Sequence, residues 1–391
     1  MGQHRDYSLT ERPRLEVADI FSRYKRLLGP LPSGHWKVVE DLVDCRTRRL
    51  GGHLRRCDSC SHQDQSYNSC RNRHCPKCQF LKKQKWVENR TKELLPVEYF
   101  HVVFTVPHIL NPLTLQNKSI LYNILFKAAS ETMKEVATRR LGAEIGFVTA
   151  LHTWGQNLIE HPHLHMIVPG GGLRRDRLKW VSCKKGYLFP IKILSTVFRG
   201  KFLSLLEKSH DDLEFYGRIS TLSTKTNFKG LLVEAAKIPW VVYAKKPFAG
   251  PKQVVSYLGQ YTHRIAISNH RLIKVEENQV HFQYRDYADK NQNKVMVLSV
   301  EEFMRRFLLH VLPKKFIRIR HYGFLGNRLR REKISCCKSL LGIKAIQTET
   351  TEKIDWKQQL KALTGIDLTL CPICKIPMRE MIVPRDYQDS S

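Results

Sequence analysis

Apolar and polar positions alternate most clearly in the middle of the chain, where they predict a β-sheet. Residues 98–107 (EYFHVVFTVP), 145–154 (IGFVTALHTW) and 161–171 (HPHLHMIVPGG) are β-branched or aromatic runs that are typical of strands. Residues 115–140 repeat apolar positions at helical spacing and predict a helix. Only the short segment 155–160 (GQNLIE) separates the second and third strands, so we expect them to form a hairpin.

Further elements are predicted on both sides of this region. Pro251 fits the first turn of a helix and Ser299 is placed to open another. We expect helices at 15–28, 79–95, 192–209, 250–263 and 299–313, and strands at 238–246, 264–268, 270–277 and 279–287.

The charge balance indicates a polyanionic partner. The 391 residues include 66 Lys and Arg against 36 Asp and Glu, a formal net charge of +30, which suits a nucleic acid phosphate backbone. Aromatic residues are interleaved with the basic ones and could stack on bases. The basic residues predicted to contact DNA are Arg71, Arg73, Lys82, Lys83, Lys85, Arg318, Arg320, Arg328 and Arg330.

No apolar run approaches the roughly 20 residues that cross a bilayer, and the first residues lack the apolar region of a secretory signal. A cytoplasmic, nucleoid-associated protein is therefore expected. In that compartment the 11 cysteines should be reduced, and pairs of them are better explained as metal ligands than as disulfides.

Two Cys-x2-Cys pairs predict a structural zinc site near the N-terminus. The pairs are Cys57 with Cys60 and Cys75 with Cys78, and two such turns can complete a tetrahedron of thiolates. Cys70 and His74 lie close by. They could replace one of these ligands or belong to a second site with Cys45, His53 or His62. Near the C-terminus, a second zinc site is a weaker prediction, with the ligands Cys336, Cys337, Cys371 and Cys374.

Histidines in the predicted hairpin indicate a second kind of metal site. Side chains alternate along a strand, so His161, His163 and His165 should share one face, with His152 beside them on the neighbouring strand. Neutral imidazoles grouped in this way can hold a divalent ion. A solvated polar strand face is the competing interpretation.

Tyr257 and Tyr261 are four residues apart in a predicted helix, so they should lie on one helix face. Two half-buried packing tyrosines would give the same pattern. The functional alternative is a pair of phenolic nucleophiles, which need activation because a phenol has a pKa of about 10.

Taken in order, four motifs resemble one family. SCRNRHCPKCQ, HTWGQNLIEHPHLHMIVPGGGL, SYLGQYTHRIAISNHRL and RIRHYGFLGNRLR are similar to motifs of the two-tyrosine HUH-superfamily transposases of rolling-circle insertion sequences, which carry an N-terminal zinc-binding domain. The similarity extends from about His35 to about Arg330.

This resemblance implies an α+β fold, with an HUH-endonuclease-like central antiparallel sheet, packed helices and a preceding zinc-ribbon-like domain. The implied regions are an N-terminal helix (1–34), a zinc-binding and DNA-binding domain (35–95), a catalytic domain (96–298) and a basic C-terminal region (299–391).

The resemblance also implies a reaction. One tyrosine attacks single-stranded DNA, leaving a 5′-phosphotyrosyl link and a free 3′-OH, with magnesium or manganese held by His163, His165 and a third ligand. His152 is the expected third ligand, and the alternatives are Gln156, His161 and Gln260.

The expected partners are single-stranded DNA at element ends, target DNA and host helicase or replication proteins, because the sequence has no G-x-x-x-x-G-K-[ST] phosphate loop. Two other functions fit the same features. One is a plasmid replication initiator or relaxase with the same chemistry, and the other is a zinc-dependent DNA-binding regulator with an inactive catalytic domain.

Overall fold

A computed structural model describes residues 15–245, 254, 259, 264–286, 289–343 and 355–386. The chain divides into two compact units. Unit 1 consists of Met1–Cys78 and Ile346–Ser391, and unit 2 of Gln79–Ala345. The division places the basic helix after Cys78 in unit 2, and the last part of the chain in unit 1.

Unit 1 contains a helical pair and a small sheet built from both ends of the chain. Helices α1 and α2 contact each other, and their apolar sides supply much of the buried surface, including Phe21 and Leu42. The sheet has the order β14-β1-β2 with antiparallel neighbours. The elements are α1 (Val17–Tyr24), α2 (Ser33–Val43), β1 (Gly52–Arg56), β2 (Gln63–Tyr67), α11 (Trp356–Thr364) and β14 (Arg379–Val383).

Unit 2 is organised on a five-stranded antiparallel sheet with the order β13-β5-β6-β3-β9. The histidine-rich strand β6 is its central member, and β5 joins it in the predicted hairpin. The strands are β3 (Tyr99–Thr105), β5 (Phe147–Trp154), β6 (Glu160–Pro169), β9 (Val242–Lys245) and β13 (Ile319–Tyr322). The expected α+β fold with an antiparallel sheet and packed helices is therefore confirmed.

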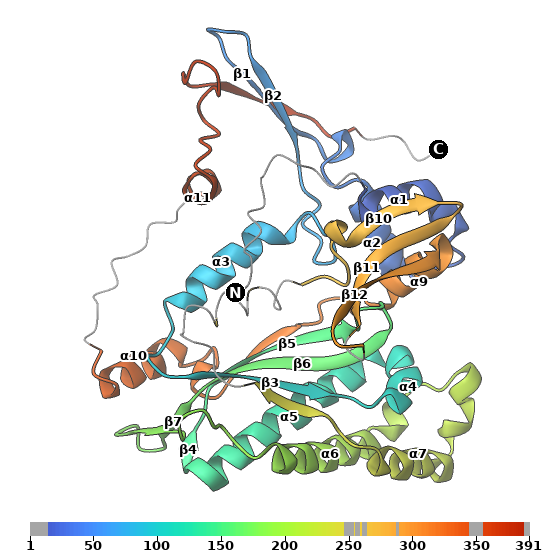
Figure 1. Ribbon diagram of the computed structural model, residues 1–391, viewed down its shortest axis with the longest axis vertical. Coiled ribbons are helices and arrows are strands. Elements are labelled where there is room, and N and C mark those ends of the chain that lie inside the picture. Colours follow the sequence, from blue (N-terminus) through green and yellow to red (C-terminus); the bar gives the residue numbers. More distant parts are fainter. Residues whose placement is uncertain are drawn as a thin grey trace. The chain divides into compact units, whose positions relative to one another are not determined.

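The two faces of this sheet have different roles. On one face, Leu164, Met166 and Val168 enter the main hydrophobic core with α5 and α6, and Figure 1 shows these helices stacked below the strands. Because strand side chains alternate, His163, His165 and Ile167 point to the other face. The helices of this part are α4 (Asn111–Gln116), α5 (Lys118–Leu141), α6 (Ile191–Lys208) and α7 (Lys225–Lys237).

Unit 2 also contains two three-stranded sheets, β10-β11-β12 and β4-β7-β8, and three further helices. The sheet β10-β11-β12 packs on α9. Ser299 caps the N-terminus of this helix, as expected, because its side chain accepts a hydrogen bond from the Glu302 amide. These elements are α3 (Gln79–Thr91), β4 (Ala143–Glu144), β7 (Gly171–Arg174), β8 (Trp180–Ser182), β10 (Leu272–Glu276), β11 (Gln279–Asp286), β12 (Gln292–Ser299), α9 (Val300–Leu309) and α10 (Arg330–Leu340).

Local patterns failed at several places. Residues 264–268 were expected to form a strand but have no ladder partner among the described residues, although Ala266 and Ile267 are buried. Conversely, several elements of the structure were not predicted, among them α2, α7 and β12. Strand β12 alternates between exposed and half-buried side chains, and its pairing with β11 over eight residues defines it. Burial and strand pairing, rather than local sequence, decide these segments.

Glu160 forms a buried polar network on the core side of the sheet. The Tyr122 hydroxyl donates to Glu160 Oε1 at 2.8 Å, and Glu160 Oε2 lies 3.6 Å from His310 Nδ1. Burial lowers the pKa of His310 to about 3 and so keeps this ring neutral. Burial also raises the pKa of Glu160 to about 7, against the opposing effects of Tyr122 and Lys118.

This shift predicts a pH dependence of stability. An unfolded glutamate loses its proton near pH 4.5, well before the buried one, so ionisation favours the unfolded state between pH 4.5 and about 7. Glu160→Gln keeps an acceptor for Tyr122 and has no proton to lose. Compared with this variant, the wild-type protein should lose about 3 kcal/mol of unfolding free energy over that interval. Urea unfolding at several pH values measures the difference, and parallel pH profiles would contradict it.

Candidate functional site

Three histidines of the central hairpin converge on the face of the sheet that lies opposite the main hydrophobic core. His152 of β5 pairs directly with His163 of β6, and His165 is the next residue on the same face. One ligand nitrogen from each ring lies within 4.8 Å of the others. The structure thus brings together the three residues that the sequence analysis preferred as metal ligands.

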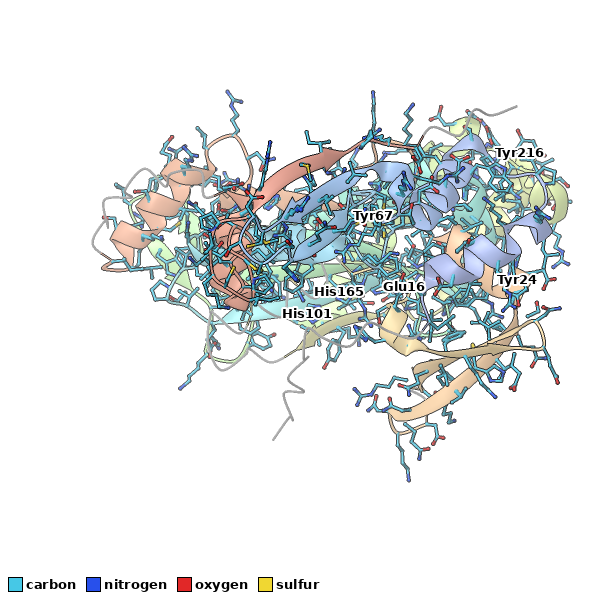
Figure 2. The ribbon with its side chains drawn as sticks, turned by 90° about the horizontal axis from the view of Figure 1, so that it is seen from above. Glu16, Tyr24, Tyr67, His101, His165 and Tyr216 are labelled. Carbon is cyan, nitrogen blue, oxygen red and sulfur yellow. The ribbon has the colours of Figure 1, made fainter. Side chains whose placement is uncertain are left out.

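Hydrogen bonds set the direction of these rings. His163 Nδ1 lies 2.6 Å from the His161 carbonyl oxygen, which leaves His163 Nε2 facing His165 Nε2 at 3.1 Å. On the other side of His165, its Nδ1 lies 2.8 Å from His101 Nε2. Figure 2 shows His101 and His165 next to each other. His101 orients the His165 ring, as outer partners of metal-binding histidines commonly do.

His101 was missed in the sequence analysis. It belongs to β3 and lies opposite Ile167, so it shares a face with the histidines of β6. The sequence feature that could have identified His101 is its place at an alternate position of the predicted strand 98–107. Its significance depends on β3 being the neighbour of β6, which the local pattern does not reveal.

The donor set fits a divalent ion. Burial lowers the pKa of His163 to about 3 and that of His165 well below its usual value, so both rings are neutral and offer lone pairs. Magnesium prefers oxygen ligands, whereas nitrogen donors favour a first-row transition ion. Of the two expected ions, manganese therefore fits these three residues better.

A cavity of about 830 Å³ opens in front of the histidines. Trp154 and Tyr284 provide aromatic surface in its lining, and the Trp154 ring stacks on His152 with centroids 4.8 Å apart. Three arginines also line the cavity, and Arg271 connects its walls by donating to the carbonyl groups of Gln156 and Gln283. The arginines are Arg264, Arg271 and Arg285. Aromatic rings and guanidinium groups together suit stacked bases and phosphates.

The alternatives for the third ligand have different positions. His161 stacks on His108, with centroids 5.1 Å apart, and is not part of the three-histidine group. Gln156 lines the cavity, and its backbone carbonyl oxygen accepts a hydrogen bond from Arg271. Gln260 lies outside the described residues.

The predicted nucleophiles Tyr257 and Tyr261 also lie outside the described residues. Three described residues lie close to them in the sequence. Val254 is buried against Tyr99 and Ile167 on the histidine face, and Arg264 lines the cavity. A Cβ added at Gly259 would overlap Val87 of α3, so this glycine permits close packing.

The structure groups the N-terminal cysteines differently from the prediction. Cys75 and Cys78 lie with Cys45 and Cys70, whereas Cys57 and Cys60 belong to another group. The expected single site over both pairs is therefore corrected, and Cys70 is a member rather than an alternative. His74 is not in either group. The reason is topological, because β1 and β2 carry the turn at Cys57 and Cys60 away from the other pair.

The expected C-terminal site is corrected as well. Cys336 and Cys337 lie on α10 in unit 2, where Cys337 is buried beside Phe324 in an apolar cluster. The Cys336 thiol donates to the carbonyl of Arg177. Cys371 and Cys374 instead join Cys57 and Cys60 in unit 1.

The residues predicted to bind DNA fall into two groups: one group is half-buried or makes intramolecular contacts, and the other is exposed. Arg320 and Arg330 make intramolecular contacts, since Arg320 lies 3.9 Å from the centre of the Phe126 ring and Arg330 pairs with Glu93. Burial lowers the pKa of Arg73 and of Lys83. Arg318 is half-buried and donates to the Arg264 carbonyl. The exposed members are Arg71, Lys82, Lys85 and Arg328.

Comparison with protein families assigns the class of this protein. Residues 146–333 match the model described as "Putative transposase", and residues 16–106 match the "Transposase zinc-binding domain". The first match covers the histidine hairpin, and the second covers the group of Cys45, Cys70, Cys75 and Cys78 together with Cys57 and Cys60. The chain is a zinc-binding transposase, and hence a DNA-processing enzyme.

Two curated proteins extend the match to nearly the whole chain. "Putative transposase y4qJ" of Sinorhizobium fredii (strain NBRC 101917 / NGR234) is 47% identical over 368 residues, covering 92% of each chain. "Transposase for insertion sequence element IS801" of Pseudomonas savastanoi pv. phaseolicola is 27% identical over 383 residues, covering 93% of this chain and 88% of that protein. The chain belongs to the IS801/IS91 family of insertion-sequence transposases.

No solved structure matches the chain. Among the described helices, none is long and apolar enough to span a membrane.

Proposed function

We propose that this transposase cleaves and rejoins single-stranded DNA by tyrosine transesterification during rolling-circle transposition. The observation that carries the proposal is the convergence of His152, His163 and His165 on one sheet face, inside a cavity lined by arginine and aromatic side chains. Val254, three residues before Tyr257, packs on the same face. The family assignment favours a transposase over a replication initiator.

The three histidines would hold manganese or magnesium, which when bound polarises the scissile phosphate and orients it for attack. Arg264, Arg271 and Arg285 neutralise and position the DNA phosphates around it. Trp154 and Tyr284 offer surfaces on which bases of a single strand can stack. A duplex hides these base faces, so the cavity favours unpaired DNA.

In the chemical step, the phosphorus atom of a DNA phosphodiester exchanges its bond to a DNA oxygen for a bond to a tyrosine oxygen. The hydroxyl of Tyr257 or Tyr261 loses its proton, its oxygen forms a bond to phosphorus, and the bond from phosphorus to the 3′ oxygen breaks. The 3′ oxygen gains a proton and leaves as a 3′-OH, so one proton is lost and one is gained. The phosphotyrosyl ester retains the energy of the original diester, so a 3′-OH can reverse the step without ATP. A second tyrosine permits another cleavage while the first is occupied.

The partners follow from this chemistry. The substrates are single-stranded DNA at the element ends and the target DNA. Because the sequence has no phosphate loop for a helicase motor, host helicase or replication proteins would supply the unwound strands.

Cleavage by a His163→Ala plus His165→Ala variant tests the role of the histidines. The substrate is a labelled single-stranded oligonucleotide spanning an element end, assayed with manganese, with magnesium and with chelator. Loss of metal-assisted stabilisation worth several kcal/mol should reduce cleavage by about a thousand-fold.

The matched control is His108→Ala plus His161→Ala. These two rings line the same cavity but are outside the three-histidine group, so cleavage should stay within about ten-fold of wild type. Equal activity of the two double variants would reject the assignment of the metal ligands.

A further inference from the structure

Two Cys-x2-Cys turns from opposite ends of the chain are built in the same way. In the first, the Cys57 amide donates to the His62 carbonyl and the Ser61 amide donates back to the Cys57 carbonyl. Ser61 has a φ of 57°. The second turn repeats the pattern: the Cys371 amide donates to Ile376, the Lys375 amide donates to Cys371, and Lys375 has a φ of 59°.

This repeated geometry has a chemical consequence. A left-handed residue directly after the second cysteine costs free energy in a residue other than glycine, so its occurrence in both turns needs a compensating interaction. A tight turn that presents two thiolates to one ion is the unit from which structural zinc sites are made.

The four sulfur atoms of the two turns lie at distances suited to one ion. Cys57 Sγ is 3.3 Å from Cys374 Sγ, Cys60 Sγ is 3.5 Å from Cys371 Sγ, and Cys60 Sγ is 3.7 Å from Cys374 Sγ. Zinc–sulfur bonds of about 2.3 Å in a tetrahedron separate the sulfurs by about 3.8 Å. A disulfide, at about 2.05 Å, would need much closer approach. The group resembles Cys45, Cys70, Cys75 and Cys78, whose sulfurs are 3.4–3.6 Å apart where they contact.

Packing alone holds the C-terminal strand weakly. Strand β14 pairs with β1 over five residues, but four of its five residues are exposed, and Ile382 is 82% exposed. One buried group adds to the ladder: Arg55 of β1 donates to the carbonyl of Leu368. Such a small apolar contact gives little stabilisation, and a metal ion is the usual supplement in units of this size.

We propose that Cys57, Cys60, Cys371 and Cys374 bind a second structural zinc ion, which attaches the C-terminal segment to the hairpin β1–β2. The matched transposase zinc-binding domain ends at residue 106, so it contains only half of these ligands. The other half is supplied from 311 residues further along the chain. In Figure 1, β14 lies alongside β1 in the same small sheet. Unit 1 is therefore complete only when both ends of the chain are present.

Zinc content of the full-length protein tests this proposal. The measurement uses a His163→Ala plus His165→Ala background, so that the three-histidine group takes no zinc. This parent should hold two zinc ions per chain after dialysis. Adding Cys371→Ser plus Cys374→Ser should leave one, while the matched control Cys183→Ser plus Cys336→Ser, outside both groups, should leave two. A parent with one ion, or a Cys371/Cys374 variant with two, would overturn the proposal.

Thiol alkylation of the unmutated protein gives a second test that does not depend on how the variants fold. During stepwise removal of zinc with a chelator, peptide mass spectrometry records which cysteines react with iodoacetamide. Cys57, Cys60, Cys371 and Cys374 should be protected together and become reactive together. Alkylation of Cys371 and Cys374 while Cys57 and Cys60 remain protected would refute a shared ion. Neither test depends on DNA cleavage, so the proposal can fail independently of the catalytic mechanism.

Discussion

Replacing both Tyr257 and Tyr261 with phenylalanine should abolish covalent capture of a labelled single-stranded oligonucleotide. Phenylalanine keeps the ring and its packing but lacks the oxygen that bonds to phosphorus, so no phosphotyrosyl ester can form. Capture should fall below detection, whereas noncovalent binding of the same oligonucleotide should remain. Each single variant should retain capture through the other tyrosine.

Tyr243→Phe is the matched control for this experiment. Tyr243 lies on the edge strand β9 of the same sheet and is 52% exposed, so its hydroxyl can be removed without disturbing the core. This variant should capture the oligonucleotide like the wild-type protein. A covalent adduct that persists in the Tyr257→Phe plus Tyr261→Phe variant would contradict tyrosine catalysis.

Replacing Cys75 and Cys78 with serine should unfold unit 1. The buried apolar side chains of this unit come mainly from α1 and α2, and Cys45 and Cys75 are themselves completely buried. Structural zinc contributes an apparent binding free energy of about 10 kcal/mol or more in small domains, which exceeds what so small a core can supply. The variant should therefore lose the zinc ion of the group that contains Cys75 and Cys78. Protease should then digest unit 1, while fragments of unit 2 persist.

The zinc measurement and the digestion should agree for this variant. Cys183→Ser plus Cys336→Ser provides the same number of substitutions outside both cysteine groups and should keep the wild-type zinc content and digestion pattern. Unchanged zinc content in the Cys75→Ser plus Cys78→Ser protein would remove these two residues from the ligand set.

The histidine hairpin could be predicted because its determinants are local. Alternation along β6 places His163 and His165 on one face, and the short connection after β5 brings His152 opposite His163. Periodicity likewise identified α5 and α6, and the serine cap identified the start of α9. In each case the residues that define the element are close together in sequence.

The cysteine groups and His101 could not be predicted in the same way. Spacing shows that Cys57 and Cys60 form one turn, but not that their partners are Cys371 and Cys374, because this depends on β14 pairing with β1. The role of His101 similarly depends on β3 being next to β6. Spacing also suggested Cys336 and Cys337 as ligands, whereas burial in an apolar cluster accounts for Cys337.

Identification of the residue that carries DNA in the captured complex is the most direct test of the catalytic mechanism. The wild-type protein is trapped on a single-stranded oligonucleotide with manganese, digested with protease and nuclease, and analysed by mass spectrometry. The mechanism predicts a 5′-phosphate linked to Tyr257 or Tyr261, and no adduct when chelator is present. A nucleotide attached to any other residue, or attached through its 3′ end, would contradict it.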